Sequence, residues 1–462
     1  MQGVLFVPSG PLAALTGEQT RKQEMRILND ISLHQRKTGP QILAVLIYVI
    51  FPLLPLLSVS LSPGWTAQAP YAKLGNSLAL IVFSILALQP VLAARLKYLD
   101  RLFGLDIIYV FHKIMGMTAA VLQICVLVFF AAGPGPYLSW PGMVGTALII
   151  ILVLSALLYR ELRLTYESWR RLHNLLFMAV LITLFLQVWQ IAYEKGSPVT
   201  AAVVSAHFIV ASALYAYHKF IGPSQRGKTL YRVVSVNRET KNVWTLTFAP
   251  PQGTPHLSYL PGQFQFITFA QGRGEEHPFT IPSSPAAAGQ HTATIKESGD
   301  FTRSIGRIQA GDKVAVQAPF GRFSYLLHPE ERDLVFIAGG IGITPFMSML
   351  RHMRDTKADK NVLLLYANNT EDDIVFRGEL DAMAGKTAPQ LRVVHVLGRA
   401  EREWSGEQGF IDRAKIEKHV IGDIKNKTFY LCGPPPMMTA LIAVLIELGV
   451  PSKRIRSERF AL

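Results

Sequence analysis

Two stretches of this 462-residue chain, YVFHKIMGMTAAVLQ (109–123) and WRRLHNLLFMAV (169–180), decide how its N-terminal half is interpreted. Each places one histidine, His112 or His173, near the start of a long apolar run. An imidazole in hydrocarbon is costly unless it is hydrogen-bonded or ligates something. The pair therefore predicts either a shared polar site inside a helical bundle or two rings that lie among lipid headgroups.

Apolar residues are concentrated before residue 220, where six segments are long enough to cross a bilayer core of about 30 Å, which takes roughly 20 residues of helix. We expect these spans at residues 41–61, 74–94, 107–131, 143–159, 171–192 and 200–220. Pro52 and Pro55 interrupt the first span, but membrane helices tolerate proline. Residues 1–40 are predicted to be a cytoplasmic N-terminal segment, and 41–221 the transmembrane domain.

The net charge of +14 is better explained by membrane orientation than by nucleic-acid binding. Basic residues gather in the second and fourth connecting loops, at Arg95, Lys97, Arg101, Arg160, Arg163, Arg170 and Arg171. The positive-inside rule then puts the N-terminus, these loops and everything after residue 220 in the cytoplasm. The chain is predicted to be a multi-pass protein of the cell (inner) membrane. The third and fifth spans both start inside, so His112 and His173 lie near the same leaflet.

Histidines opposed at one depth fit the axial ligation of a single low-spin haem iron. Gly116, Ala119 and Ala120 follow His112 by one and two turns and leave room for a flat ring. Several basic residues are candidates to pair with the propionates: Arg95, Lys97, Arg101, Lys113 and Arg170. The chain has only two cysteines, Cys125 and Cys432, which excludes a disulfide framework and a cysteine-based zinc or iron–sulfur site.

The pattern changes after the linker GPSQRGK (222–228). Short alternating strands such as YRVVSVNRE (231–239) and FQFITFA (264–270) predict an antiparallel β-barrel domain over 228–328. Apolar strands that alternate with helices predict a doubly wound α/β domain over 332–462. The chain is therefore predicted to be a multi-domain protein with a six-helix bundle, a barrel and a parallel sheet.

Two glycine-containing segments have the chemistry of phosphate binding. In IKESGDFTRSI (295–305), a glycine precedes Thr302 and Ser304 at the start of a helix, where backbone N–H groups and hydroxyls suit a pyrophosphate. In LVFIAGGIGITP (334–345), a strand ends in glycines that open a helix, so the backbone can approach a phosphate and the helix dipole favours its charge. A tight strand-to-helix turn has similar needs and is the alternative for the second segment.

These features together resemble the ferric reductase and NADPH oxidase superfamily, in which six helices precede ferredoxin-reductase-type FAD and NAD(P)H domains. The resemblance implies a haem between the third and fifth helices. Members usually carry a second histidine on each of these helices, for an outer haem. Here those positions fall at Cys125 or Val126 and at Leu186 or Gln187, so we expect one haem b, at the inner site. Fourteen residues of helix rise about 21 Å, which leaves a long route to the outer face.

The resemblance also implies roles for the soluble half. The residues implied to bind FAD are His277, Pro278, Phe279 and Thr280 in the barrel, with Gly299, Thr302 and Ser304 at the diphosphate. Those implied to bind NADPH, or NADH, are Gly339, Gly340, Gly342, Thr344, Pro345, Gly433 and Pro434, with Arg399 at a 2′-phosphate. Those implied to act at hydride transfer are Cys432, Glu458 and Phe460, although two residues follow Phe460 where some members end. A structural core cysteine is the alternative for Cys432.

The predicted function is a membrane oxidoreductase that passes electrons from cytoplasmic NAD(P)H through FAD to the haem. The acceptor would be a quinone, ferric iron or a periplasmic or membrane protein, and the partners would include the lipid bilayer but no nucleic acid. Superoxide production from oxygen, or a haem-binding sensor without turnover, are the alternatives. His207, in the sixth span, is open to three roles: quinone binding, ligation of a differently placed haem, or a hydrogen bond inside the bundle.

Overall fold

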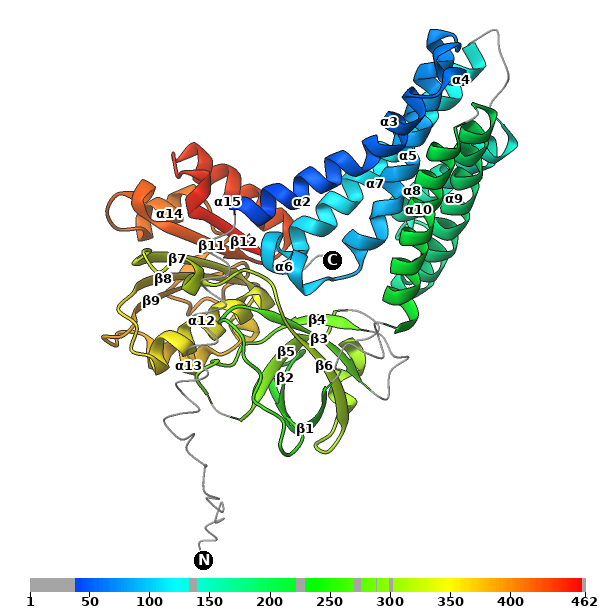
Figure 1. Cartoon of the computed structure of the whole chain (residues 1–462). Coiled ribbons are helices and arrows are strands. Elements are labelled where there is room, and N and C mark those ends of the chain that lie inside the picture. The colour runs from blue at the N-terminus through cyan, green and yellow to red at the C-terminus, as the bar shows by residue number, and fades with distance from the viewer. Residues whose placement is uncertain are drawn as a thin grey trace, which may run out of the picture. The chain divides into compact units, whose positions relative to one another are not determined.

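The computed structural model describes residues 38–132, 139–195, 197–221, 229–269, 276–287, 289–298 and 302–458. The chain divides into two compact units, Lys37–Arg226 and Gly227–Leu462, which are described separately. Figure 1 shows helices in the first unit and two sheets with their helices in the second.

The first unit is helical throughout its described residues. Its elements are, in chain order, α2 (Thr38–Ile50), η1 (Phe51–Leu53), α3 (Leu54–Ser60), α4 (Pro63–Thr66), α5 (Pro70–Ala93), α6 (Lys97–Phe103), α7 (Leu105–Ala132), α8 (Trp140–Leu158), α9 (Tyr166–Glu194), α10 (Pro198–Ala216) and η2 (Tyr217–Ile221). Pro52 and Pro55 fall where α2 gives way to the short helices η1 and α3, because proline removes a backbone donor from the helical ladder.

Six helices in the described residues are long and apolar enough to cross a membrane, as predicted. They are Gly39–Ser60, Pro70–Ala93, Leu105–Ala131, Trp140–Leu158, Tyr166–Glu194 and Pro198–Ala216. Helix α5 is the most buried of them and lies at the centre of the bundle, since it packs against α7, α9 and α10. The core of this unit includes Phe83 and Leu80 of α5, which are fully buried.

The second unit begins with six antiparallel strands. They are β1 (Thr229–Thr240), β2 (Val243–Ala249), β3 (Phe264–Phe269), β4 (His277–Thr280), β5 (His291–Lys296) and β6 (Lys313–Phe320), with the short helix η3 (Thr302–Arg307) between the last two. Their order in the sheet is β4-β3-β6-β1-β2-β5. The predicted antiparallel domain is confirmed, but the edge strands β4 and β5 do not pair within the described residues, so the barrel is not closed by hydrogen bonds.

A parallel sheet follows in the order β10-β9-β8-β7-β11-β12. Its strands are β7 (Asp333–Gly339), β8 (Asn361–Asn368), β9 (Gln390–Leu397), β10 (Glu407–Gln408), β11 (Thr428–Cys432) and β12 (Ile455–Glu458). The α-helices of this part are α12 (Thr344–Asp355), α13 (Arg377–Met383), α14 (Arg413–His419) and α15 (Pro435–Glu447), and the 3-10 turns are η4 (Tyr325–Leu327), η5 (Gly340–Ile343), η6 (Glu371–Asp373), η7 (Ile424–Asn426) and η8 (Ser452–Arg454). This confirms the predicted doubly wound domain.

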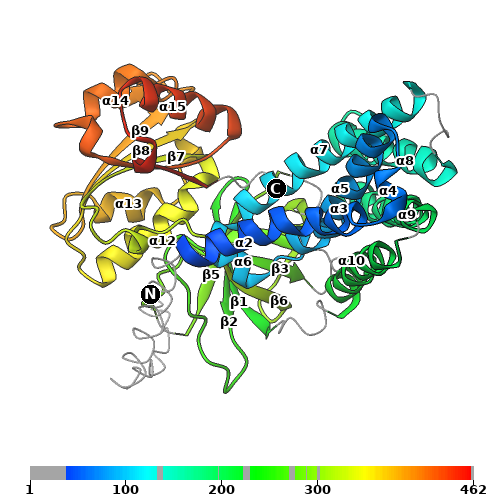
Figure 2. The same ribbon diagram turned by 45° about the horizontal axis from the view of Figure 1, so that its top comes forward.

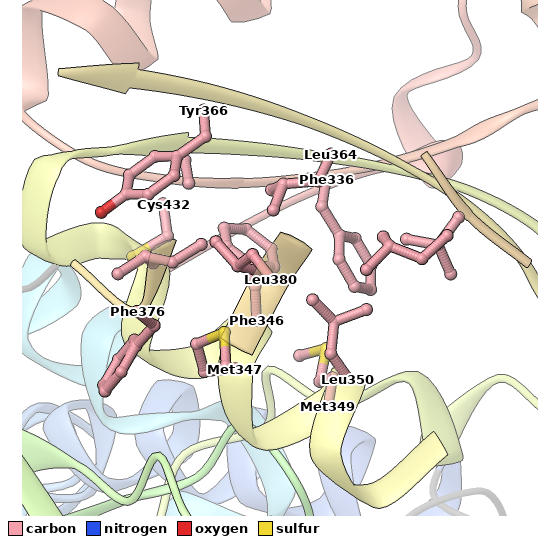
Figure 3. Close-up of a cluster of buried hydrophobic side chains, with 14 of the residues drawn as sticks. Phe336, Phe346, Met347, Met349, Leu350, Leu364, Tyr366, Phe376, Leu380 and Cys432 are labelled. Carbon is pink, nitrogen blue, oxygen red and sulfur yellow. The ribbon is translucent and has the colours of Figure 1, made fainter. Parts of the chain in front are cut away.

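The two faces of this sheet are covered by different helices. Figures 1 and 2 both show α12 and α13 on one face and α14 and α15 on the other. Successive side chains of a strand alternate between faces, so Phe336 packs under α12 while Ile337 packs under α15. Figure 3 shows the first of these cores, to which Cys432 also belongs and in which Phe336 stacks on Phe346 with ring centres 4.8 Å apart. Burying a side chain of this size contributes about 1.5–3 kcal/mol.

Candidate functional site

The predicted nucleotide loop forms the carboxyl edge of the parallel sheet. Strand β7 ends at Gly339, and η5 leads directly into helix α12. Gly340 has φ +54, a left-handed conformation that favours glycine, and a Cβ added there would meet nothing within 4 Å. Thr344 donates from its hydroxyl to the Ile341 carbonyl (3.1 Å), and Pro345 lies in the first turn of α12. The helix therefore begins beside open space, as a phosphate requires.

The Cys-Gly-Pro segment lies directly against this loop. Cys432 pairs with Ala338 of β7, so both strands end at the same level. A Cβ on Gly342 would lie 2.3 Å from the Cys432 carbonyl oxygen, and one on Gly433 would lie 3.1 Å from the Gly339 Cα. Glycine is required because two backbone segments touch here. The structure thus brings the predicted nicotinamide residues from β7 and β11 together.

The side chain and the backbone of Cys432 lie in different environments. Its side chain is fully buried in the core of Figure 3, which agrees with the structural role that was the alternative. Burial, and then the neighbouring Glu458 charge, raise the pKa of the thiol, so the thiol stays neutral. Its backbone forms the edge described above and pairs with Glu458 at the end of β12. Glu458 is buried, and its Oε1 would lie 3.1 Å from a Cβ on Gly321 of the antiparallel domain. Phe460 lies outside the described residues.

The predicted flavin residues His277–Thr280 form strand β4 at the edge of the antiparallel sheet. Phe279 pairs with Gln265 of β3 and is half-buried, while the Thr280 side chain is buried. Thr302 begins η3 and its hydroxyl accepts a hydrogen bond from the Ser298 N–H (2.8 Å). Ser304 lies in the same short helix, but its side chain and Gly299 lie outside what is described. The edge strand and the hydroxyl-bearing turn therefore both belong to the antiparallel domain.

A set of contacts that sequence reasoning missed joins the flavin segment to the nucleotide helix. Arg351 of α12 donates to the Pro282 carbonyl (2.9 Å), and the Ser348 hydroxyl donates to the Ser283 carbonyl (2.9 Å). Arg351 is itself held by both carboxylate oxygens of Glu379, at 2.9 and 2.5 Å. Pro282 and Ser283 follow β4 at once, so α12 is fixed against the predicted flavin strand. Nothing in the local pattern around Arg351 signals this long-range partner.

Arg399 lies at the carboxyl end of β9. Its backbone N–H donates to the Asn369 carbonyl (2.7 Å), and the Gly398 N–H donates to the Asn368 carbonyl (2.9 Å). The loops that follow β8 and β9 are thus neighbours on the same edge as the nucleotide loop. This places Arg399 beside Asn369.

His112 and His173 occupy equivalent places in the helical unit. Each lies seven residues after the first residue of its helix, in α7 and α9, and both helices pack against α5. The two rings are near enough to interact electrostatically. In each, Nδ1 is buried and has no hydrogen-bond partner in the described parts of the chain. A Cβ added at Gly116, one turn after His112, would meet nothing within 4 Å. Unpartnered imidazoles beside free space fit a ring-shaped ligand held through iron.

Further along the same helices, a polar cluster connects α7, α8 and α9. The Gln123 side-chain amide donates to Thr146 Oγ1 (3.1 Å) and to Gln187 Oε1 (3.2 Å), and all three side chains are buried. Gln187 is one of the positions at which the resembling family has a second ligand. Gln123 Oε1 and Gln187 Nε2 find no partner among the described residues. An amide network therefore links the helices at the level where a second histidine pair would fall.

His207 of α10 is held inside the bundle. Its Nδ1 lies 2.8 Å from the Val203 carbonyl oxygen and its Nε2 lies 3.2 Å from that of Phe51, against whose ring it also packs. Phe51 lies in η1, where its carbonyl oxygen accepts the Leu54 N–H and Pro55, four residues on, has no N–H to donate to it, so one lone pair of that oxygen is left for His207. Of the three roles considered for His207, the geometry favours the hydrogen bond inside the bundle, because both ring nitrogens face backbone oxygens.

Comparisons with known proteins concern chiefly the second unit. A family model of the oxidoreductase FAD-binding domain matches residues 231–325, and one of the oxidoreductase NAD-binding domain matches 336–442. NADH-cytochrome b5 reductase 1 of Meyerozyma guilliermondii is 31% identical over 269 residues, which cover 56% of this chain and 94% of that protein. The corresponding protein of Arabidopsis thaliana is 31% identical over 225 residues, or 47% of this chain and 79% of that protein.

A solved structure extends the likeness of fold. The flavohemoglobin from Malassezia yamatoensis with bound FAD and heme superposes with a TM-score of 0.50 and 18% identity, over 84% of this chain and 99% of that chain. At this identity the likeness concerns the fold alone. The FAD- and NAD-binding domains, together with the six apolar helices, are consistent with a ferric reductase-like flavohaem membrane reductase, which the sequence resembles. The chain belongs to the family of oxidoreductases in which a ferredoxin-reductase-type FAD-binding domain is followed by an NAD-binding domain.

Proposed function

We propose that this protein is a membrane oxidoreductase that passes electrons from cytoplasmic NAD(P)H through FAD to one b-type haem and on to an acceptor in or across the membrane. The observation that carries the proposal is the pair His112 and His173, whose buried, unpartnered ring nitrogens lie in an apolar bundle of a chain with FAD- and NAD-binding domains. When bound, FAD supplies the conversion between hydride and single-electron transfer, and haem supplies a one-electron centre.

The nicotinamide would bind at the edge formed by β7 and β11. Gly339, Gly340 and Gly342 let the backbone approach the dinucleotide, and the N-terminus of α12 favours its phosphate charge. Gly433 and Pro434, which follow β11, would contact the dinucleotide from the side opposite the loop after β7. The carboxylate of Glu458 polarises the region of hydride transfer, while the neutral, buried Cys432 thiol packs behind it.

The flavin would lie along strand β4. Phe279 offers its half-buried ring and backbone to the isoalloxazine, and Thr280 offers a hydroxyl to N5. His277 and Pro278 complete the strand, and Thr302 with Ser304 would hold the diphosphate. Arg351 and Ser348 fix α12 to the segment after β4, so the two nucleotide sites are held in a constant relation. Phe460 is proposed to cover the flavin until nicotinamide displaces it.

The proposed preference is for NADPH. Arg399 lies beside Asn369 at the edge where an adenosine 2′-phosphate would reach, and a guanidinium suits a phosphate. The yeast and plant relatives are named as NADH enzymes, so the preference is tested directly. Replacing Arg399 with alanine should lower kcat/KM for NADPH about tenfold or more and leave that for NADH nearly unchanged. Equal losses with both nucleotides would contradict the assignment.

The membrane half is tested by pigment analysis of the purified full chain. We expect one haem per FAD, with a low-spin spectrum. His112→Ala and His173→Ala should each abolish haem reduction while NAD(P)H still reduces FAD. His207→Gln is the matched control, because the His207 ring nitrogens face the backbone oxygens of Val203 and Phe51, and this variant should keep its haem.

Other outcomes decide between the remaining functions. Two haems per FAD, or normal haem turnover in both alanine variants, would overturn the ligand assignment. Haem-loaded protein that consumes no NAD(P)H would instead favour a sensor. If NAD(P)H oxidation reduces oxygen to a product that superoxide dismutase removes, the function is superoxide production rather than reduction of a quinone or of ferric iron.

A further inference from the structure

The first turn of α9 presents a tryptophan to the proposed haem ligand. Trp169 lies one helical turn before His173, so both side chains are on one face. The centre of its ring is 5.2 Å from that of His173. It also stacks on Tyr159, with ring centres 5.0 Å apart and planes inclined by 27°. Tyr166 packs against it as well, at 5.5 Å. The indole is therefore clamped in one orientation.

This orientation leaves the indole N–H without a partner. Trp169 Nε1 is buried, and no described residue accepts a hydrogen bond from it. A buried indole N–H usually finds an acceptor, because a buried donor without one has lost its hydrogen bonds to water and gained none in exchange. Because the rings of Tyr159, Tyr166 and His173 all pack against the indole, turning its N–H toward water would break these contacts. The missing acceptor is therefore expected to belong to something that the chain binds.

The positive charges near Trp169 indicate what kind of acceptor this is. Arg170 follows Trp169 and lies over the Tyr166 ring, and Lys219 lies close to Arg170 after the end of α10. Neither cation forms an ion pair with a carboxylate in the described residues, and Glu167, on the same turn, does not approach Arg170 within 4 Å. Two neighbouring cations and an unused N–H suit an anionic oxygen.

We propose that Trp169 Nε1, Arg170 and Lys219 form a binding site for a carboxylate or phosphate oxygen, and that this oxygen belongs to a propionate of the haem held by His173. The inference rests on the proposed function and extends it to residues that the sequence did not single out as a set. Proximity to His173 favours the haem carboxylate as the source. A phospholipid headgroup carries the same chemistry and is the other source that the experiment must separate.

The test uses Trp169→Phe, which keeps a stacked ring and removes only the N–H. Trp189→Phe is the matched control, because Trp189 lies on the same helix and stacks on Tyr193, well away from His173. Arg170→Gln is compared with Arg171→Gln, its exposed neighbour. The readouts on purified full-length protein are the rate of haem transfer to apomyoglobin, the haem midpoint potential and the lipid that remains bound.

A hydrogen bond to a charged group contributes about 1.5–3 kcal/mol, so Trp169→Phe should lose haem roughly ten- to hundredfold faster. Its midpoint potential, like that of Arg170→Gln, should shift downward, because the propionate charge is less compensated. Both controls should match the wild type. Wild-type haem retention and potential in Trp169→Phe would overturn the inference and leave His112 and His173 as ligands. Unchanged haem properties with loss of a bound phospholipid would assign the site to lipid. A wild-type protein without haem would overturn the proposed function itself.

Discussion

Substitution of Gly342 by alanine tests the close approach on which the nicotinamide site depends. The added Cβ would lie 2.3 Å from the carbonyl oxygen of Cys432, 2.7 Å from its carbonyl carbon and 2.9 Å from the Gly433 nitrogen. Ordinary contacts begin at 3.4 Å, so the loop after β7 and the end of β11 would have to separate by about 1 Å. All three atoms are backbone, so no side chain can rotate away.

Two measurable effects follow from this separation. Overpacking of a well-packed site costs about 1–3 kcal/mol, so the FAD-loaded protein should unfold at a lower temperature. A displacement of 1 Å at a reacting centre costs as much as ~100-fold in rate. We therefore expect flavin reduction by NAD(P)H, followed anaerobically by rapid mixing, to slow by one to two orders of magnitude in Gly342→Ala.

Gly378→Ala is the control for this experiment. Gly378 lies in α13, and a Cβ there would meet nothing within 4 Å. Alanine is the better helix former, so this variant should be as stable as the wild type or slightly more so. Wild-type flavin reduction and stability in Gly342→Ala would refute the argument that backbone contact between β7 and β11 shapes the site.

Three further predictions concern particular side chains. Burial alone would raise the pKa of Glu379, but the hydrogen bonds and charge of Arg351 lower it. The ionised carboxylate therefore stabilises the fold above about pH 4.5, and this stabilisation is lost as the pH falls through the lowered pKa. The stability of Glu379→Gln, measured by acid unfolding, should fall less steeply below pH 4.5 than that of the wild type. Burial lowers the pKa of His291 to about 3, so below pH 6.5 the unfolded chain takes up a proton that the folded chain does not. The free energy of unfolding should therefore fall by up to ~1.4 kcal/mol per pH unit between pH 6.5 and 3. His291→Gln should flatten this part of the stability profile, and an unchanged slope would contradict the role given to His291. Gln187→Leu should destabilise the detergent-solubilised bundle by about 1 kcal/mol, because it removes one hydrogen bond to Gln123. The double variant Gln187→Leu, Gln123→Leu should be closer to neutral, because neither partner is then left unpaired by the other. Denaturant titration followed by circular dichroism of the helices measures both free energies of unfolding.

The candidate site was predictable where its chemistry lies in consecutive residues. The segment around Gly339–Pro345 predicts a strand, a glycine turn and a helix, and the structure has all three in that order. His112 and His173 were identifiable because each is a polar residue in an apolar run. Membrane and sheet periodicities are local properties, so composition alone carries them.

The contacts that fix the site were not predictable in this way. The Cys432 side chain belongs to the core while its backbone shapes the edge, a division that no pattern in YLCGPPP reveals. The bond from Arg351 to the Pro282 carbonyl joins residues 69 positions apart. The partners of His207 likewise depend on η1, which lies 156 positions away along the chain.

By itself, the sequence determined the six apolar helices, the order of the antiparallel and parallel sheets, and the residues with redox chemistry, because hydrophobic period and turn chemistry act over a few residues. Only the tertiary structure decided that β7 and β11 touch through glycine backbone, that a glutamine network joins α7 to α9, and that the Trp169 N–H faces no acceptor among the residues that the structure describes. These features depend on which atoms come into contact after the chain has folded. The energy of such contacts is set by the geometry of segments far apart in the sequence rather than by local sequence pattern.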